Sequence, residues 1–240
     1  MGTLRLVRHG QASYGASNYD VLSERGVAQA RALGAAWAAA RLPIDGLYTG
    51  PMQRQVDTAR HLRDAAAEAG HAVPEPMVVA ELAEYPAFEL LGRFLPSIVR
   101  DEPDLQGLID GSAVATTRPE LIDRAFWRVV DAWTGDRLDC GDLETFGQFV
   151  ARVSRGVDGL IARHGGRGQR VVAVTSGGPI GVAAKLALGL EARATVELWR
   201  LVRNASVSDL LWRSRGAERQ LSLLGWNHVD HLADELHTFR

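Results

Sequence analysis

The tripeptide Arg8-His9-Gly10 follows an alternating, apolar stretch, TLRLV (3–7), and combines three side-chain types that suit phosphate chemistry. An imidazole can act as a nucleophile. A guanidinium matches the oxygens of a phosphate group with two parallel hydrogen bonds, and a glycine lets the backbone come close to a ligand. An isolated Arg-His-Gly sequence is more often an ordinary surface loop, so the prediction of a site needs further residues.

A second loop supplies another arginine. In YTGPMQRQVDTA (48–59), a short apolar strand ends at a turn, and Arg54 then falls in the first turn of the next helix. Two arginines at neighbouring strand ends suit a dianionic group of oxygens better than they suit each other. We therefore expect Arg8 and Arg54 to face a common anion.

A third loop lies in VVAVTSGGPIG (171–181). Four apolar residues lead into Thr175, Ser176 and two glycines, and an alanine-rich helix follows. This order predicts a buried strand that ends at a helix N-terminus. Backbone N–H groups at such an end can bind an anion.

Strands alternate with amphipathic helices along most of the chain. The periodicity predicts strands at 3–7, 44–50, 73–82 and 171–174, helices at 23–41, 51–69, 143–164 and 179–190, and a hairpin at 206–213 and 219–225. This alternation indicates an α/β fold, a three-layer sandwich whose mostly parallel sheet has helices on both faces. Ligands of such sheets bind outside the carboxyl ends of the strands, where the three loops lie.

One stretch, at about 83–142, departs from the alternation, with four prolines, scattered charges and short helical pieces. We expect one domain over 1–240, with this stretch as a helical insertion over the C-terminal strand edge. Its aromatic residues could line the site, but we favour a small core of their own. They are Tyr85, Phe88, Phe94, Phe126, Trp127 and Trp133.

The composition excludes several classes of function. The formal net charge is −2, so no general basic field draws the chain to nucleic acid or to an anionic membrane. The single cysteine, Cys140, excludes an internal disulfide framework, and no cluster is arranged as a metal site. The N-terminus lacks an apolar signal core, and no apolar run is long enough to cross a bilayer. We expect a soluble, cytoplasmic protein.

Taken together, the motifs resemble the histidine phosphatase superfamily, which includes the cofactor-dependent phosphoglycerate mutases. The resemblance rests on LVRHGQ, LSERGVAQARALG and TGPMQRQVDTA in this order, followed by ETFGQFVARV and a strand ending in TSGG. It extends over nearly the whole chain and is weakest in the insertion and the C-terminal tail.

The resemblance implies a role for several residues. His9 would be the nucleophile that takes up the phosphoryl group, and Arg8 and Arg54 would clamp its oxygens. Glu84, in LAE (82–84), would be the acid, with Glu81 as the rival because the register of the preceding strand is uncertain. The loop on the substrate side would present Gln11, Ser13 and Asn18.

The sequence departs from the family at one important position. Most members carry a second catalytic histidine in patterns such as VSHGG, and VTSGG places Ser176 there. Ser176 offers one neutral hydrogen bond in place of a charged imidazole, and the Gly177 N–H group would still bind the substrate. His228 or His231, in the tail GWNHVDHL, could supply the missing imidazole.

The favoured function is hydrolysis of phosphomonoesters through a phosphohistidine on His9, without a cofactor or metal. The partner would be a small phosphorylated substrate. The alternative is a phospho-ligand-binding protein with weakened turnover, because Ser176 replaces the histidine. Phosphoglycerate mutase activity fits less well, because nothing in the insertion can be assigned to binding a carboxylate. The oligomeric state is not indicated by the sequence.

Overall fold

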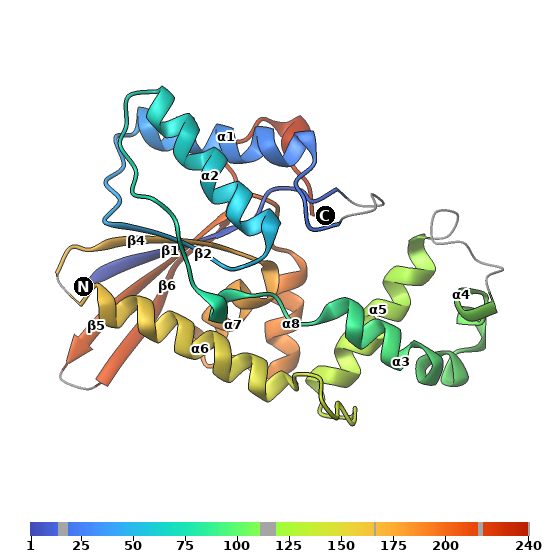
Figure 1. Ribbon diagram of the computed structural model, residues 1–240. Coiled ribbons are helices and arrows are strands. Elements are labelled where there is room, and N and C mark those ends of the chain that lie inside the picture. The colour runs from blue at the N-terminus through green and yellow to red at the C-terminus, as the bar shows by residue number, and fades with distance from the viewer. Residues whose placement is uncertain (14–18, 111–118, 166, 216–217, 240) are drawn as a thin grey trace. The chain divides into compact units, whose positions relative to one another are not determined.

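The structure is a computed structural model that describes residues 1–13, 19–110, 119–165, 167–215 and 218–239. The chain divides into two compact units (Figure 1). The first comprises residues 1–84 and 150–240, and the second comprises residues 85–149.

The first unit is built on a six-stranded sheet in the order β3-β2-β4-β1-β5-β6. The strands β1, β2, β3 and β4 run parallel, while β5 pairs antiparallel with both β1 and β6. Their bounds are Gly2–Arg8 for β1, Gly46–Thr49 for β2, Met77–Val78 for β3, Arg170–Thr175 for β4, Val207–Arg215 for β5 and Glu218–His228 for β6. The predicted hairpin is therefore present.

Helices cover both faces of this sheet, as predicted (Figure 1). The helices α1 (Glu24–Ala39) and α2 (Gln53–Glu68) lie on one face. The other face carries α6 (Phe146–Arg163), α7 (Gly177–Leu188) and α8 (Ala192–Arg200). The central strands β2 and β4 are buried on both faces, which explains their continuous apolar sequences. The main core cluster consists of Val7, Leu33, Trp37, Leu47, Ala59, Leu62, Val172, Val174 and Val207.

Two predictions about elements need correction. The stretch 73–82 forms a strand only at Met77–Val78, and a 3-10 helix, η1, follows at Ala80–Leu82. The helix α8 was not predicted. It is only nine residues long and follows α7 closely, so the sequence gives few turns in which a helical period could be recognised.

The second unit is helical. It contains α3 (Ala87–Asp101), the 3-10 helix η2 (Pro103–Leu105), α4 (Gly107–Asp110), α5 (Pro119–Thr134) and the first turn of α6. The ring of Tyr85 stacks on Trp133, and both are buried together with Phe149. These aromatic residues form a core within the unit. The predicted insertion at about 83–142 covers most of the unit, which extends to Phe149. Its position over the strand edge, and the description of 1–240 as one domain, stay predictions.

No helix in the described ranges combines the length and the apolar character that crossing a bilayer would require.

A close backbone approach fixes the start of α1 against the loop after β1. The Ser23 hydroxyl caps α1 by accepting a hydrogen bond from Gly26 N at 3.1 Å. A Cβ atom added at Gly26 would lie 2.1 Å from Gln11 O, and one added at Gly10 would lie 2.4 Å from Gly26 O. Two glycines therefore allow the loop and the helix to touch.

The C-terminal segment packs back onto the first unit. Val229 and Leu232 form a small core with Ala205, and Leu236 packs against it. His231 lies in this segment, hydrogen-bonded with the Ala205 backbone. Burial lowers the pKa of His231 from its ordinary value of 6.5 to about 4, so the ring is neutral near pH 7.

Gly26→Ala tests the close approach. We expect the added methyl group to push the loop of residues 9–11 away from α1 and to lower the free energy of unfolding by about 1–3 kcal/mol. Gly159→Ala is the matched control, because it lies in an exposed position of α6 with open space around it. That change should stabilise the protein by roughly 0.5–1 kcal/mol. Urea unfolding measures both, and equal effects would contradict the steric explanation.

His231→Gln tests the effect of its lowered pKa. Between pH 6.5 and about 4, the unfolded chain binds a proton at His231 that the folded chain does not bind, so stability falls as the pH falls. The variant should show a shallower loss of unfolding free energy over this range. Unfolding curves at four pH values check this, and an unchanged slope in His231→Gln would contradict it.

Candidate active site

The carboxyl ends of β1, β4 and β2 meet at one edge of the sheet, and the three loops predicted to carry chemistry leave from there. His9 N donates a hydrogen bond to Thr175 O at 2.8 Å, and Gly50 N donates one to Val174 O at 2.9 Å. These bonds extend the strand pairing into the loops. As a result, His9 and Ser176 follow directly from paired positions of adjacent strands, since Arg8 pairs with Thr175.

The imidazole of His9 is buried, with 4% of the residue exposed. Its Nδ1 lies 2.7 Å from Gly10 O, and its Nε2 lies 3.2 Å from Arg54 Nε. A carbonyl oxygen can only accept, so we assign the ring proton to Nδ1. Nε2 then carries the lone pair, which accepts the hydrogen bond from Arg54.

The surroundings of His9 keep it neutral. Burial lowers the pKa of His9 well below 6.5, and the positive charges of Arg54 and then Arg8 lower it further, while the hydrogen bond to Gly10 opposes them. A neutral imidazole retains the lone pair that a nucleophile needs. The site therefore keeps the His9 ring in its neutral form.

Hydrogen bonds hold the backbone of the His9 loop on both sides. Gly10 N donates to the Thr58 hydroxyl at 2.9 Å, and that hydroxyl donates to Arg54 O at 2.7 Å. His9 O accepts from Asn204 Nδ2 at 3.2 Å and from Ala205 N at 3.3 Å. The loop is thus fixed to α2 and to the segment before β5.

Arg54 is buried in the first turn of α2 and is oriented by an acidic residue that the sequence analysis missed. Its Nη1 donates to Asp20 Oδ1 at 2.7 Å, and Asp20 Oδ2 accepts from Gln53 N at 2.8 Å. A carboxylate at a helix N-terminus is also favoured by the helix dipole. Asp20 precedes α2 by more than 30 residues, so no local spacing could have identified this contact.

Arg8 ends β1 and is held by two carbonyl groups. Its Nη1 donates to Phe239 O at 2.9 Å and also to Val202 O. Its positive charge contributes to the lowered pKa of His9. Arg54 bonds directly to the His9 ring, and a phosphate clamp shared by Arg8 and Arg54 stays a prediction.

Gln11 and Ser13, two of the residues predicted on the substrate side, bond to residues in and just before α1. Gln11 Oε1 accepts from the Ser23 hydroxyl at 3.0 Å, and Gln11 N donates to Gln29 Oε1 at 2.8 Å. Ser13 N donates to Val21 O at 2.8 Å. Asn18 lies outside the described residues. Gln11 therefore helps to fix the start of α1, and a contact with substrate stays a prediction.

The segment after η1 brings Glu84, not Glu81, to the start of α7. Gly178 N donates to Glu84 Oε2 at 3.3 Å. Glu81 instead packs its Cβ atom against Gly156 of α6. The register that was uncertain in the sequence is fixed by Arg152, which donates to Glu81 O and Ala83 O at 2.9 Å each. Of the two candidates, Glu84 therefore lies beside the start of α7, and its role as the acid stays a prediction.

Ser176 is completely buried. It is the N-cap residue of α7, which begins at Gly177. Its hydroxyl oxygen accepts a hydrogen bond from Gln55 Nε2 at 2.8 Å. The sequence analysis did not select Gln55, because its contact with Ser176 joins residues far apart in the chain. Successive residues of α2 therefore contact His9 and Ser176.

The two tail histidines lie elsewhere. His228 is half-exposed at the end of β6, and its Nδ1 is 3.9 Å from Asp230 Oδ2. His231 packs against Ala205. In the described part of the chain, neither one hydrogen-bonds to His9 or Ser176. The geometry therefore gives no support to the prediction that His228 or His231 supplies the missing imidazole.

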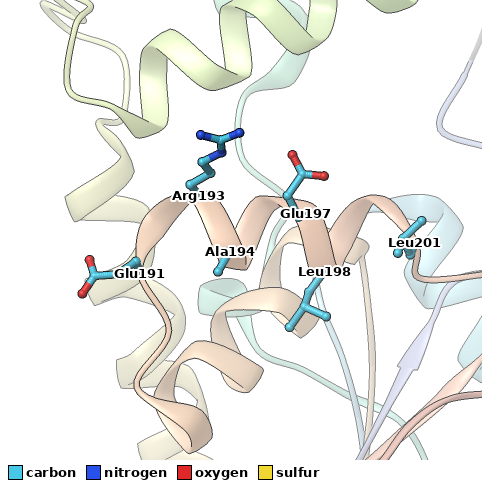
Figure 2. Close-up of a pocket in the computed structure, with 6 residues that line it drawn as sticks. All are labelled: Glu191, Arg193, Ala194, Glu197, Leu198 and Leu201. Carbon is cyan, nitrogen blue, oxygen red and sulfur yellow. The ribbon is translucent and has the colours of Figure 1, made fainter.

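A hollow on the surface runs along α8, and Figure 2 shows Arg193 and Glu197 projecting from the same side of this helix. Its lining consists of Glu191, Arg193, Ala194, Glu197, Leu198 and Leu201. None of these is a predicted site residue. Within the described residues, no three His, Cys, Asp or Glu side chains gather as metal ligands.

Several solved structures are similar to this chain. A mycobacterial glucosyl-3-phosphoglycerate phosphatase in complex with VO3 shares 24% identity with a TM-score of 0.60, over 94% of this chain and 98% of that one. A phosphoserine phosphatase mutant from Entamoeba histolytica, in complex with phosphoserine, shares 15% identity with a TM-score of 0.63, over 97% and 100%. A phosphoglycerate mutase from Bacillus anthracis shares 18% identity with a TM-score of 0.62, over 95% and 94%. At these identities the likeness concerns the fold.

A search of curated proteins gave no significant match. The model of the histidine phosphatase superfamily (branch 1) matches residues 4–107 and 88–227, which together span most of the chain. Phosphatases and mutases of this superfamily share the α/β sheet described above. The chain belongs to the histidine phosphatase superfamily.

Proposed function

We propose that the chain hydrolyses small phosphomonoesters through a phosphohistidine on His9. One observation carries this proposal: a buried, neutral imidazole whose Nδ1 donates to Gly10 O and whose Nε2 faces the guanidinium of Arg54. A substrate phosphoryl group drawn to the guanidinium would meet the lone pair of Nε2. Membership in a superfamily of phosphatases and mutases supports the same reaction class.

The first half of the proposed reaction forms the P–N bond. Nε2 attacks phosphorus in line with the ester oxygen, and the P–O bond to the alcohol breaks. The Glu84 carboxyl group, in its protonated form, gives its proton to the leaving oxygen, and the alcohol departs. Positive charge on the imidazole is offset by its hydrogen bond to Gly10 O, which favours the charged ring.

The second half returns the free enzyme. The Glu84 carboxylate takes a proton from water, the hydroxide oxygen attacks phosphorus, and the P–N bond breaks. Inorganic phosphate leaves, and His9 is again neutral. Arg8 and Arg54 stabilise the phosphoryl oxygens in both halves, because preorganised positive charges offset the negative charge that develops there.

A small phosphorylated metabolite suits this site better than a polymer. The solved relatives named above include one in complex with phosphoserine and one in complex with VO3. The near-neutral net charge of −2 provides no general attraction for nucleic acid. We propose a phosphorylated small molecule as the substrate.

The alternative is a phosphate-binding protein with little turnover. One observation favours it: Ser176 is uncharged and already accepts a hydrogen bond, so it cannot match the charge that an imidazolium would supply. Losing one electrostatic partner typically costs about 10²–10³ in rate. Because His9 and both arginines are present, we favour reduced hydrolysis over its loss. Mutase activity lacks a comparable observation.

His9→Ala tests the proposed nucleophile. We expect hydrolysis of p-nitrophenyl phosphate to fall by roughly 10³-fold or more, because the covalent route is lost. His228→Ala, a change at a half-exposed histidine, should leave the rate unchanged. Acid-labile phosphate should be trapped on the wild type and absent from His9→Ala.

Two outcomes would overturn parts of this proposal. Hydrolysis that persists in His9→Ala would exclude His9 as the nucleophile. Saturable binding of vanadate by a wild type that shows no hydrolysis would favour the phosphate-binding protein.

The lowered pKa of His9 gives a prediction for pH. Below its pKa the ring is protonated and loses the attacking lone pair, so kcat/KM should fall as the pH falls, but only well below pH 6.5. An NMR titration of the His9 ring measures the pKa directly. In Arg54→Gln the titration should move to higher pH, because a positive charge that lowers the pKa is removed. A wild-type ring that is half protonated at pH 6.5 would contradict this account.

A further inference from the structure

Gln55 is completely buried in the first turn of α2, and each polar atom of its amide is bonded. Its Oε1 accepts from Met52 N at 3.1 Å. Its Nε2 donates to the Ser176 hydroxyl oxygen at 2.8 Å and to Leu82 O at 3.4 Å. Since a backbone N–H faces one end of the amide and a carbonyl faces the other, the amide has a single satisfied orientation. Gln55 can therefore only donate to Ser176.

The backbone just after β2 lies close to the Gln55 amide. A Cβ atom added at Gly50 would lie 2.1 Å from Gln55 Oε1 and 2.7 Å from Leu82 O. A larger residue at position 50 would thus displace the amide. Leu82 O also accepts from the Thr175 hydroxyl at 2.7 Å, which ties the same corner to β4. Gly50, Gln55, Leu82 and Thr175 therefore form a closely packed support for Ser176.

The hydroxyl of Ser176 keeps one hydrogen-bond donor unused. A serine hydroxyl has one proton to donate and can accept at its oxygen, and the oxygen here accepts from Gln55. Among the described residues, the Ser176 hydroxyl donates no hydrogen bond to a protein acceptor. A buried donor without an acceptor is costly, so a ligand oxygen that accepts from it gains affinity.

This donor lies at the edge where His9 reacts. Ser176 directly follows Thr175, whose carbonyl accepts from His9 N. The two contacts made by α2, from Arg54 to His9 and from Gln55 to Ser176, come from adjacent residues. Glu84 approaches the same helix start through Gly178 N. A phosphoryl group on Nε2 of His9 therefore has Ser176 as a neighbour.

We propose that Gln55 is a positioning residue that aims the Ser176 hydroxyl as a neutral donor to an oxygen of the transferred phosphoryl group. The inference rests on the proposed function of the site. Gln55 fills the space beside residue 176, so the pair excludes a larger side chain there. The Gln55–Ser176 pair thus occupies the corner that a second histidine would otherwise use.

A double-mutant cycle tests the coupling of the pair. Gln55→Met keeps the length of the side chain and removes the donor, and Ser176→Ala removes the hydroxyl. We expect each single change to lower kcat for p-nitrophenyl phosphate by roughly 10-fold to 100-fold with a smaller change in KM. The double variant should be no slower than the slower single variant, because the two residues act as a unit.

Gln53→Met is the matched control for the cycle. Gln53 lies in the same helical turn, but its side chain is exposed and bonds to Asp57. Its combination with Ser176→Ala should give the effect of Ser176→Ala alone. Multiplicative effects of Gln55→Met and Ser176→Ala on kcat would overturn the proposal, as would an unchanged kcat in Gln55→Met.

A second experiment tests whether Gln55 occupies the space that a larger side chain at position 176 would need. It does not depend on catalytic activity. Ser176→His should lower the melting temperature by roughly 2–10 °C, because the imidazole overlaps the volume of Gln55. Adding Gln55→Ala should recover half or more of that loss, whereas adding Gln53→Ala should recover none. A Ser176→His variant as stable as the wild type would contradict the shared space, and so would a double variant that recovers nothing.

These measurements distinguish failure of the inference about Gln55 and Ser176 from failure of the proposed function. If the wild type and His9→Ala hydrolyse substrate equally, the proposed function fails. Vanadate affinity then replaces kcat in the cycle, and the melting temperatures are read as before. If His9→Ala abolishes hydrolysis while the cycle shows independent effects, the function stands and the role of Gln55 is excluded.

Discussion

The structure depends on one constraint: a buried imidazole must stay neutral beside two guanidinium groups. For His9, the hydrogen bond from Nδ1 to Gly10 O fixes the ring, and burial together with Arg54 and Arg8 lowers its pKa. A protonated ring would be repelled by both arginines and would have no lone pair. The same charges that would attract a phosphate group therefore keep its proposed acceptor neutral.

The surrounding fold serves this constraint by bringing three strand ends to one edge. Parallel pairing of β4 with β1 and β2 places the loops side by side, and α2 contacts two of them with successive residues, Arg54 and Gln55. Asp20 holds the first of these and Ser176 accepts from the second. One helical turn thus links the charged part of the site to its neutral part.

Much of the fold could be predicted because its signals are local. Apolar alternation and helical periodicity gave the α/β class and the order of elements. The contacts of Asp20 with Arg54 and of Gln55 with Ser176 join residues 34 and 121 positions apart, and no local pattern encodes them. The sequence left the positions of Glu81 and Glu84 open for the same reason. These positions depend on hydrogen bonds that Arg152, in α6, donates to the carbonyl groups of Glu81 and Ala83.

The central claim is that phosphorus bonds to Nε2 of His9. A crystal structure of the protein soaked with orthovanadate tests it most directly. The account predicts vanadium within bonding distance of Nε2, with both guanidinium groups on the equatorial oxygens. Vanadate bound at any other place, or a ring turned so that Nδ1 faces the metal, would contradict it.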